Sequence, residues 1–238
     1  MQPEYLAQLS EPVQRLIFEV ERQGRIVIQV EPDASLNDLG PLGNGLLGVE
    51  INSRRTRIYA PTNGYFPDGA VCHEVLHVRR FHVDGIPKIV LARAVAFDPG
   101  LEAMFTEIDN AIEHLVIVPE ELQLHPERRQ HWELVAEGVW ADADTVSLAE
   151  RRFAACMHWT FMRHVLPMSP HTDVARTFIS KHGLMEDAQR FADRIIESLI
   201  DKKALVQHIM DAFPEMPWGS AEFQLFERVR RPTPGAYD

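Results

Sequence analysis

The 238-residue sequence predicts an α+β fold in which a small β-sheet is followed by a mostly helical C-terminal half. Three short segments rich in β-branched residues lie between residues 25 and 61, and from residue 127 onward apolar residues recur at helical spacing. The chain is 45% hydrophobic and 25% charged, which is enough to bury a sizeable core. We therefore expect a sheet-containing region over 1–125 and a helical region over 126–238, which can pack on the first as one unit.

The N-terminal quarter predicts a helix and then the sheet. Apolar residues over 3–23 are spaced for one amphipathic helix, and Gly24 follows as a stop signal. The segments 25–32, 46–53 and 56–61 are short and are separated by Gly, Pro, Asn or Asp. They predict the strands of a small, partly antiparallel sheet.

Helices dominate the rest of the chain. Asp68 is a candidate N-cap for a helix that stops at Gly85, and segment 86–97 fits either a strand or a helix. Pro99 opens a further helix, which should finish before Pro119 because proline lacks the amide hydrogen a helix needs. Further helices are predicted near residues 128–139, 146–165, 171–182, 184–200 and 201–213, before a loose tail at 231–238.

Composition excludes several classes of protein. The net charge of −11 argues against nucleic acid as the primary partner, because phosphate backbones are bound by accumulated Lys and Arg. The N-terminus lacks the basic start and apolar run of a secretory signal, and no apolar run approaches the roughly 20 residues of a membrane span. Cys72 and Cys156 are too few for a disulfide framework. We expect a soluble, cytoplasmic protein with no membrane partner.

The segment CHEVLH at 72–77 is the main candidate for a metal-binding site, because it contains His-Glu-x-x-His on a predicted helix. Residues four apart lie on one helix face, so His73 and His77 can both bind one metal ion, for which Zn²⁺ is the expected choice. Glu74 lies beside this pair, where a carboxylate can take a proton from a water activated by the metal. His82 is rotated about half a turn away from His73, so we expect a surface position for it.

A catalytic zinc needs a third protein ligand, which we expect from the helix that begins after Pro99. Glu107, Asn110 and His114 are spaced three and four residues apart and therefore share one face of that helix. We take His114 as the ligand, with Asn110 orienting a ligand and Glu107 as the alternative donor. Asp109 and Glu113 are turned toward another side, although Glu113 also remains an alternative.

On these residues the chain resembles the HExxH zincins, and among them the ImmA/IrrE-type metallopeptidase domain of bacteria and their mobile elements. The order helix, small sheet, HExxH helix, second helix and proline agrees over roughly 1–122, and Asn110 stands at the family's distance before Pro119. The position of the family's metal-binding glutamate is occupied by Ile108, so only His73, Glu74 and His77 carry over.

The predicted function is therefore that of a zinc metallopeptidase that cleaves a cytoplasmic, regulatory protein, the substrate class that the resemblance implies. A sheet edge at 56–61 is predicted to receive the substrate as an added strand. The alternative is a non-catalytic, zinc-binding regulatory or protein-interaction module of the same fold, and hydrolysis of something other than a peptide is a third possibility. His158 lies in an amphipathic stretch and is predicted to be core or groove wall rather than a ligand.

Overall fold

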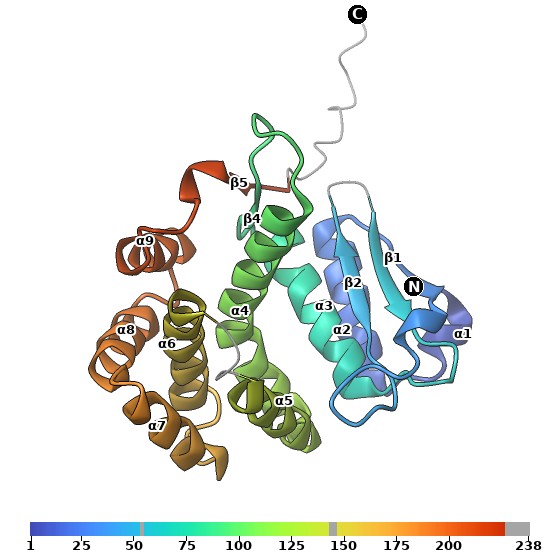
Figure 1. Cartoon of the computed structure of the whole chain (residues 1–238). Coiled ribbons are helices and arrows are strands. Elements are labelled where there is room, and N and C mark those ends of the chain that lie inside the picture. Colours follow the sequence, from blue (N-terminus) through green and yellow to red (C-terminus); the bar gives the residue numbers. More distant parts are fainter. Residues whose placement is uncertain (53–54, 143–146, 227–238) are drawn as a thin grey trace, which may run out of the picture. The chain divides into compact units, whose positions relative to one another are not determined.

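The computed structural model describes residues 1–52, 55–142 and 147–226 (Figure 1). The fold is α+β, as predicted, with a small mixed sheet and a helical C-terminal half. The chain divides into two compact units. The first contains residues 1–39 and 44–87 with Leu225 and Phe226, and the second contains residues 40–43 and 88–224.

The first unit is a three-stranded sheet with helices. Its helices are α1 (Pro3–Leu6), α2 (Glu11–Gly24), the 3₁₀ helix η1 (Ala34–Leu36) and α3 (Asp68–His82), and its strands are β1 (Ile28–Pro32), β2 (Gly48–Ile51) and β3 (Thr56–Ala60). The strand order is β1-β3-β2, with β1 parallel and β2 antiparallel to β3. The three predicted strands are thus confirmed as a partly antiparallel sheet.

The two faces of this sheet differ in burial because side chains alternate along each strand. Val30 and Ile58 are buried on the face that belongs to the core. On the other face Arg57 pairs with Glu31 at 2.9 Å, and the hydroxyl of Tyr59 donates to a carboxylate of β2 at 2.8 Å. Helices α2 and α3 pack against each other to complete the core of this unit.

Two details of the first unit correct the sequence predictions. The helix expected over 3–23 is broken into α1 and α2, and Pro12 lies in the first turn of α2, where its missing N–H costs no hydrogen bond. The segment 56–61 is not a sheet edge, because β3 pairs with a strand on both sides. Strand order depends on contacts between distant segments, which the local pattern of residues 56–61 does not encode.

The close approach of α2 and α3 explains Gly24. A Cβ atom at this position would lie 3.1 Å from Cβ of His82. The helix start at Asp68 also differs from the prediction, since the N-cap is Pro67 and the Asp68 carboxylate accepts a hydrogen bond from Ser10 N at 3.0 Å. Asp68 therefore ties α3 to the start of α2 instead of capping its own helix.

The second unit is mainly helical. Its helices are α4 (Pro99–Leu124), η2 (Pro126–Arg128), α5 (Arg129–Asp142), α6 (Leu148–His164), α7 (His171–Lys181), α8 (Met185–Glu197), α9 (Lys202–Ala212) and η3 (Trp218–Ser220), and its strands are β4 (Lys88–Leu91) and β5 (Ala221–Gln224). The strands pair antiparallel, so the ambiguous segment 86–97 contains a strand. The five helices predicted after residue 127 are confirmed. The predicted tail at 231–238 lies outside the described residues.

Helix α4 continues past Pro119, which contradicts the predicted end of that helix. Proline at position 119 cannot donate to the carbonyl four residues earlier, which belongs to Leu115. The His164 ring of α6 makes a hydrogen bond to the backbone of Leu115 instead. A side chain from another helix thus satisfies the carbonyl, and the helix continues to Leu124.

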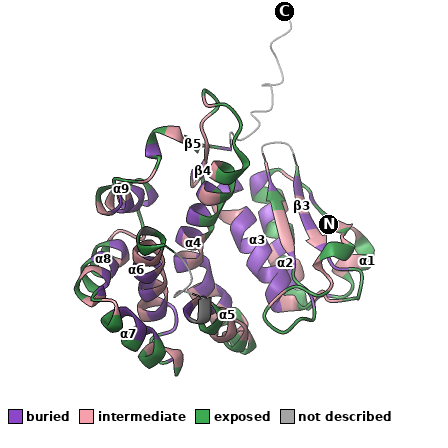
Figure 2. Ribbon diagram, viewed as in Figure 1, coloured by how far each residue is buried: buried purple, intermediate pink, exposed green. Residues whose placement is uncertain are grey.

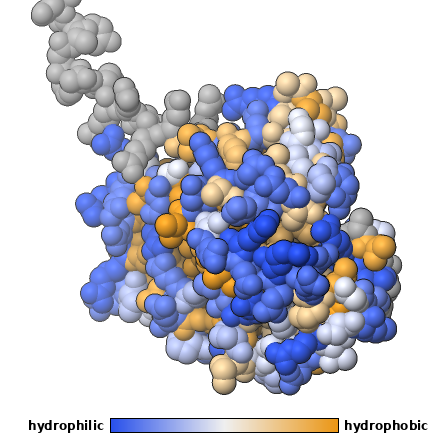
Figure 3. All heavy atoms as spheres, turned by 90° about the vertical axis from the view of Figure 1, so that its left-hand side faces the viewer, coloured by the Kyte–Doolittle hydropathy of each residue, from blue (hydrophilic) through white to orange (hydrophobic). Residues whose placement is uncertain are grey.

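Packing in the second unit joins α6 to α8, α5 to α7 and α4 to β4. Buried residues lie mainly on the inner faces of these helices, and exposed residues lie mainly on the outer faces (Figure 2). The face over α7, α8 and α9 is mainly hydrophilic (Figure 3). Among the helices that the structure describes, none has the length and apolar character needed to cross a membrane.

Candidate metal centre

The His-Glu-x-x-His segment lies on α3, which is buried along almost its entire length. His73, Glu74 and His77 are only 7%, 8% and 5% exposed. Their apolar neighbours on the helix, Cys72, Val75 and Leu76, are buried as well. Burying polar side chains costs free energy unless they have partners, so these three residues are not an ordinary solvated helix face.

The four-residue spacing places the two imidazoles next to each other. The ring centroids of His73 and His77 lie 4.8 Å apart, and the rings are nearly perpendicular. This is the arrangement expected for two side chains on the same helix face. Helix α3 therefore presents two nitrogen donors from consecutive turns.

His114 is half-buried on α4, and its ring is held by an aromatic contact. It packs edge to face against Trp132, with 4.9 Å between the ring centroids. The indole of Trp132 donates to a buried carboxylate oxygen of Glu121 at 3.0 Å, and Arg128 pairs with the same carboxylate at 2.7 Å. This chain of contacts fixes the indole and thereby restricts the ring of His114.

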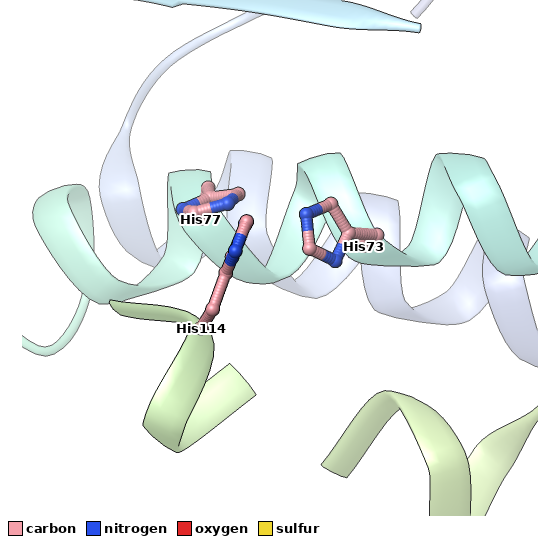
Figure 4. A group of neighbouring side chains, drawn as sticks. All are labelled: His73, His77 and His114. Carbon is pink, nitrogen blue, oxygen red and sulfur yellow. The ribbon is translucent and has the colours of Figure 1, made fainter. Parts of the chain in front are cut away.

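His73, His77 and His114 form a group that could hold a metal ion (Figure 4). Each offers one ring nitrogen, and these nitrogens all lie within 4.8 Å of one another. Three neutral imidazoles fit the preference of zinc and leave its fourth position open.

The other candidate donors on α4 lie elsewhere. Glu107 and Asn110 are exposed, and Glu107 does not belong to the histidine group. Glu113 is fully buried, and its Oε1 lies 2.7 Å from Nζ of Lys202. Of the donors predicted for this helix, the structure therefore groups only His114 with the pair on α3.

A buried ion cluster near the candidate site was not predicted from the sequence. Nζ of Lys202 on α9 lies 2.6 Å from Oδ1 of Asp109 and also contacts Glu113, and all three side chains are almost fully buried. The amide of Ile89 donates to the same Asp109 oxygen at 2.9 Å. Burial raises the pKa of Asp109, and the Lys202 charge opposes this rise. The cluster joins α4 to β4 and α9.

The predicted surface position of His82 is wrong. This ring is 7% exposed, stacks on Phe226 at 5.1 Å between centroids and lies 3.5 Å from Oγ1 of Thr56. Burial lowers its pKa, although a hydrogen bond with the backbone of Asn52 opposes the shift. His82 is thus a core histidine at the end of α3, and it does not belong to the group of candidate ligands.

Comparisons with protein-family models, curated proteins and solved structures gave no match to this chain.

Proposed function

We propose that this protein is a zinc-dependent metallopeptidase whose metal is held by His73, His77 and His114 and whose base is Glu74. One observation carries the proposal. A His-Glu-x-x-His segment lies on a buried helix, and a third imidazole is grouped with its two histidines. The general preference of catalytic zinc for three protein ligands and one open position supports a catalytic rather than a structural centre.

A bound zinc ion would supply Lewis acidity, which lowers the pKa of a water molecule and polarises a carbonyl group. Glu74 follows His73 directly, so its carboxylate lies beside the ligand pair and can accept the proton that the attacking water loses. The same carboxyl then delivers that proton to the leaving amine. Its 8% exposure limits contact with bulk solvent, which favours transfer to the substrate.

The resemblance to the ImmA/IrrE-type domain supports a protein substrate and also defines where this chain differs. Ile108 occupies the position of the family's metal-binding glutamate, and its side chain is 2% exposed in the apolar interior. This position can offer no donor atom. His114, six residues further along α4, supplies the third ligand in our proposal.

Metal content tests the centre directly. We expect mass spectrometry of the native protein to find one zinc per chain, and His73→Ala and His114→Ala to lose it. Glu107→Ala is the matched control, because Glu107 is exposed on the same helix and should not affect zinc binding. Loss of zinc in Glu107→Ala but not in His114→Ala would reverse the ligand assignment, and no zinc in the metal-supplied native protein would refute the centre.

Glu74→Gln tests the chemistry. It keeps the shape of the side chain but removes the base, so zinc should remain bound while cleavage of a degenerate peptide library falls at least about 100-fold. Cleavage is measured by mass spectrometry of the library products. A zinc-loaded native protein that cleaves no more than Glu74→Gln would instead support a non-catalytic zinc-binding module.

A further inference from the structure

The helical second unit contains a large pocket, with a volume of about 920 Å³. Protein interiors are close-packed and contain few voids larger than a water molecule, so a pocket of this size is a distinct feature of the unit. Pockets of about 300–1,000 Å³ typically take cofactors and drug-sized ligands. Residues of α4, α5 and α6 and the segment after α9 form its walls.

Methionine and aromatic side chains are frequent in the lining. The pocket is lined by Met104, Met157, Met162 and Met216 together with Trp132, Trp140, Phe153, Phe161 and Phe213. Methionine is flexible and polarisable, and aromatic rings offer large apolar surfaces at little cost in conformational entropy. Such a lining favours an apolar ligand and tolerates variation in its shape.

One buried donor in this lining lacks an acceptor. Trp140 is 5% exposed, and its indole Nε1 has no hydrogen-bond partner among the described residues. An indole N–H can only donate, and buried donors normally find an acceptor. Packing against Phe178, at 5.6 Å between centroids, holds the indole in place. Because this nitrogen is shielded from solvent, a small shift of the indole in the pocket wall would let an acceptor atom on a ligand satisfy it.

The charged groups of the lining disfavour an anion. Glu107, Glu150 and Glu215 line the pocket and are exposed, so they lie where it meets solvent. Hydrogen bonds with Ser147 hold the pKa of Glu150 below its ordinary value and keep it ionised. Arg152 pairs with Glu215 at 3.8 Å, which leaves the other two carboxylates to set the charge of the opening. A ligand with a carboxylate or phosphate would meet repulsion here.

We propose that this pocket binds an uncharged, mainly apolar small molecule that carries a hydrogen-bond acceptor, such as a ketone oxygen. Burial lowers the pKa of His158, another lining residue, to about 4, so its ring stays neutral at pH 7. The interior of the pocket therefore offers no positive charge from His158 to attract an anion. His114, the third ligand of the proposed metal centre, also lines this pocket, but binding of the small molecule does not require a bound metal ion.

Fluorescence titration with 6-propionyl-2-dimethylaminonaphthalene tests the proposal, because this probe is uncharged, apolar and carries a ketone. We expect saturable binding of one probe per chain with a blue-shifted emission. Ala154→Trp places a large ring in the pocket wall and should weaken binding at least tenfold. Val174→Trp is the matched control on α7, because Val174 is 53% exposed and does not line the pocket.

Trp140→Phe tests the donor without filling the pocket. It keeps an aromatic ring but loses the N–H, so binding of the ketone probe should weaken about fivefold. Trp159→Phe is its control, because the indole Nε1 of Trp159 is also buried without a partner but Trp159 does not line the pocket. Equal effects of the two substitutions would overturn the role given to Trp140.

Two further measurements separate this proposal from the metallopeptidase. His73→Ala should bind the probe like the native protein even if it has lost zinc. The anionic dye 1-anilinonaphthalene-8-sulfonate should bind more weakly than the ketone probe. Absence of saturable probe binding, unchanged binding in Ala154→Trp, or tighter binding of the anionic dye would refute the proposed ligand chemistry.

Discussion

Replacement of Lys202 by Met should destabilise the protein strongly, because Lys202 on α9 is the cation of the buried cluster and pairs with two carboxylates of α4. Its Nζ lies 2.6 Å from Asp109 and 2.7 Å from Glu113, and the side chains of the three residues are at most 4% exposed. Met has nearly the same length and apolar volume, so the substitution removes the charge without opening a large cavity. Two buried carboxylates then remain without their cation.

Breaking a buried ion pair by removing one partner typically costs about 3–5 kcal/mol. We expect a loss of this size in the free energy of unfolding at pH 7, measured by urea denaturation followed by circular dichroism. Arg190→Met is the control, because the pair of Arg190 with Asp187 at 2.6 Å lies on the surface, where such pairs contribute at most about 1 kcal/mol.

The pH dependence of this loss follows from Asp109. A carboxyl whose pKa is raised on folding stabilises the native state below its unfolded pKa, and this contribution is lost as pH rises through the folded pKa. Burial raises the pKa of Asp109, and removal of Lys202 removes the charge that opposes the rise. Lys202→Met should therefore be more destabilising at pH 8 than at pH 5. A loss below about 1 kcal/mol, or one independent of pH, would refute the buried cluster.

Three further predictions concern single side chains of the second unit. Burial lowers the pKa of His158 to about 4. The free energy of unfolding should therefore fall by up to about 3 kcal/mol as pH falls from about 6.5 to 4. In urea denaturation across this pH range, His158→Gln should show a smaller decrease than the native protein. His164→Leu should lower the free energy of unfolding by about 1 kcal/mol, because the Leu115 carbonyl loses its hydrogen-bond partner. Pro119→Ala restores a backbone amide that can donate to this carbonyl. In a double-mutant cycle, His164→Leu should therefore be less destabilising in the Pro119→Ala background. Trp132→Ala should weaken zinc binding about 10–100-fold in a competition assay with a chelator, since the ring of His114, the proposed third ligand, loses its support.

Local sequence patterns are sufficient to predict most of the helices and strands. The strands at 28–32, 48–51 and 56–60 and the five helices after residue 127 follow from hydrophobic periodicity and from Gly and Pro positions. The His-Glu-x-x-His pair was also identifiable, because its geometry depends only on helical spacing. His114 was chosen from the face that it shares with Glu107 and Asn110, and its place in the histidine group depends on tertiary structure.

Features that depend on distant residues were not predictable in this way. Strand β3 is central because it pairs in parallel with β1, residues 28–32, although β2 lies between these two strands in the sequence. Strand β5 pairs with β4 across more than a hundred residues, and it is only four residues long. The burial of His82 depends on Phe226, far along the chain. Each of these outcomes depends on a tertiary partner that no short sequence window contains.

Helix α4 places its polar residues in several different environments. Asp109 and Glu113 are four residues apart, so they share a face, and that face is buried against Lys202. Glu107 and His114 both line the apolar pocket, but only His114 is also grouped with the histidines of α3. A small rotation of α4 would move His114, whereas the strong electrostatic cost of separating the buried ions opposes such a rotation. The cluster around Lys202 therefore helps to hold the α4 segment that carries His114 in place within this unit.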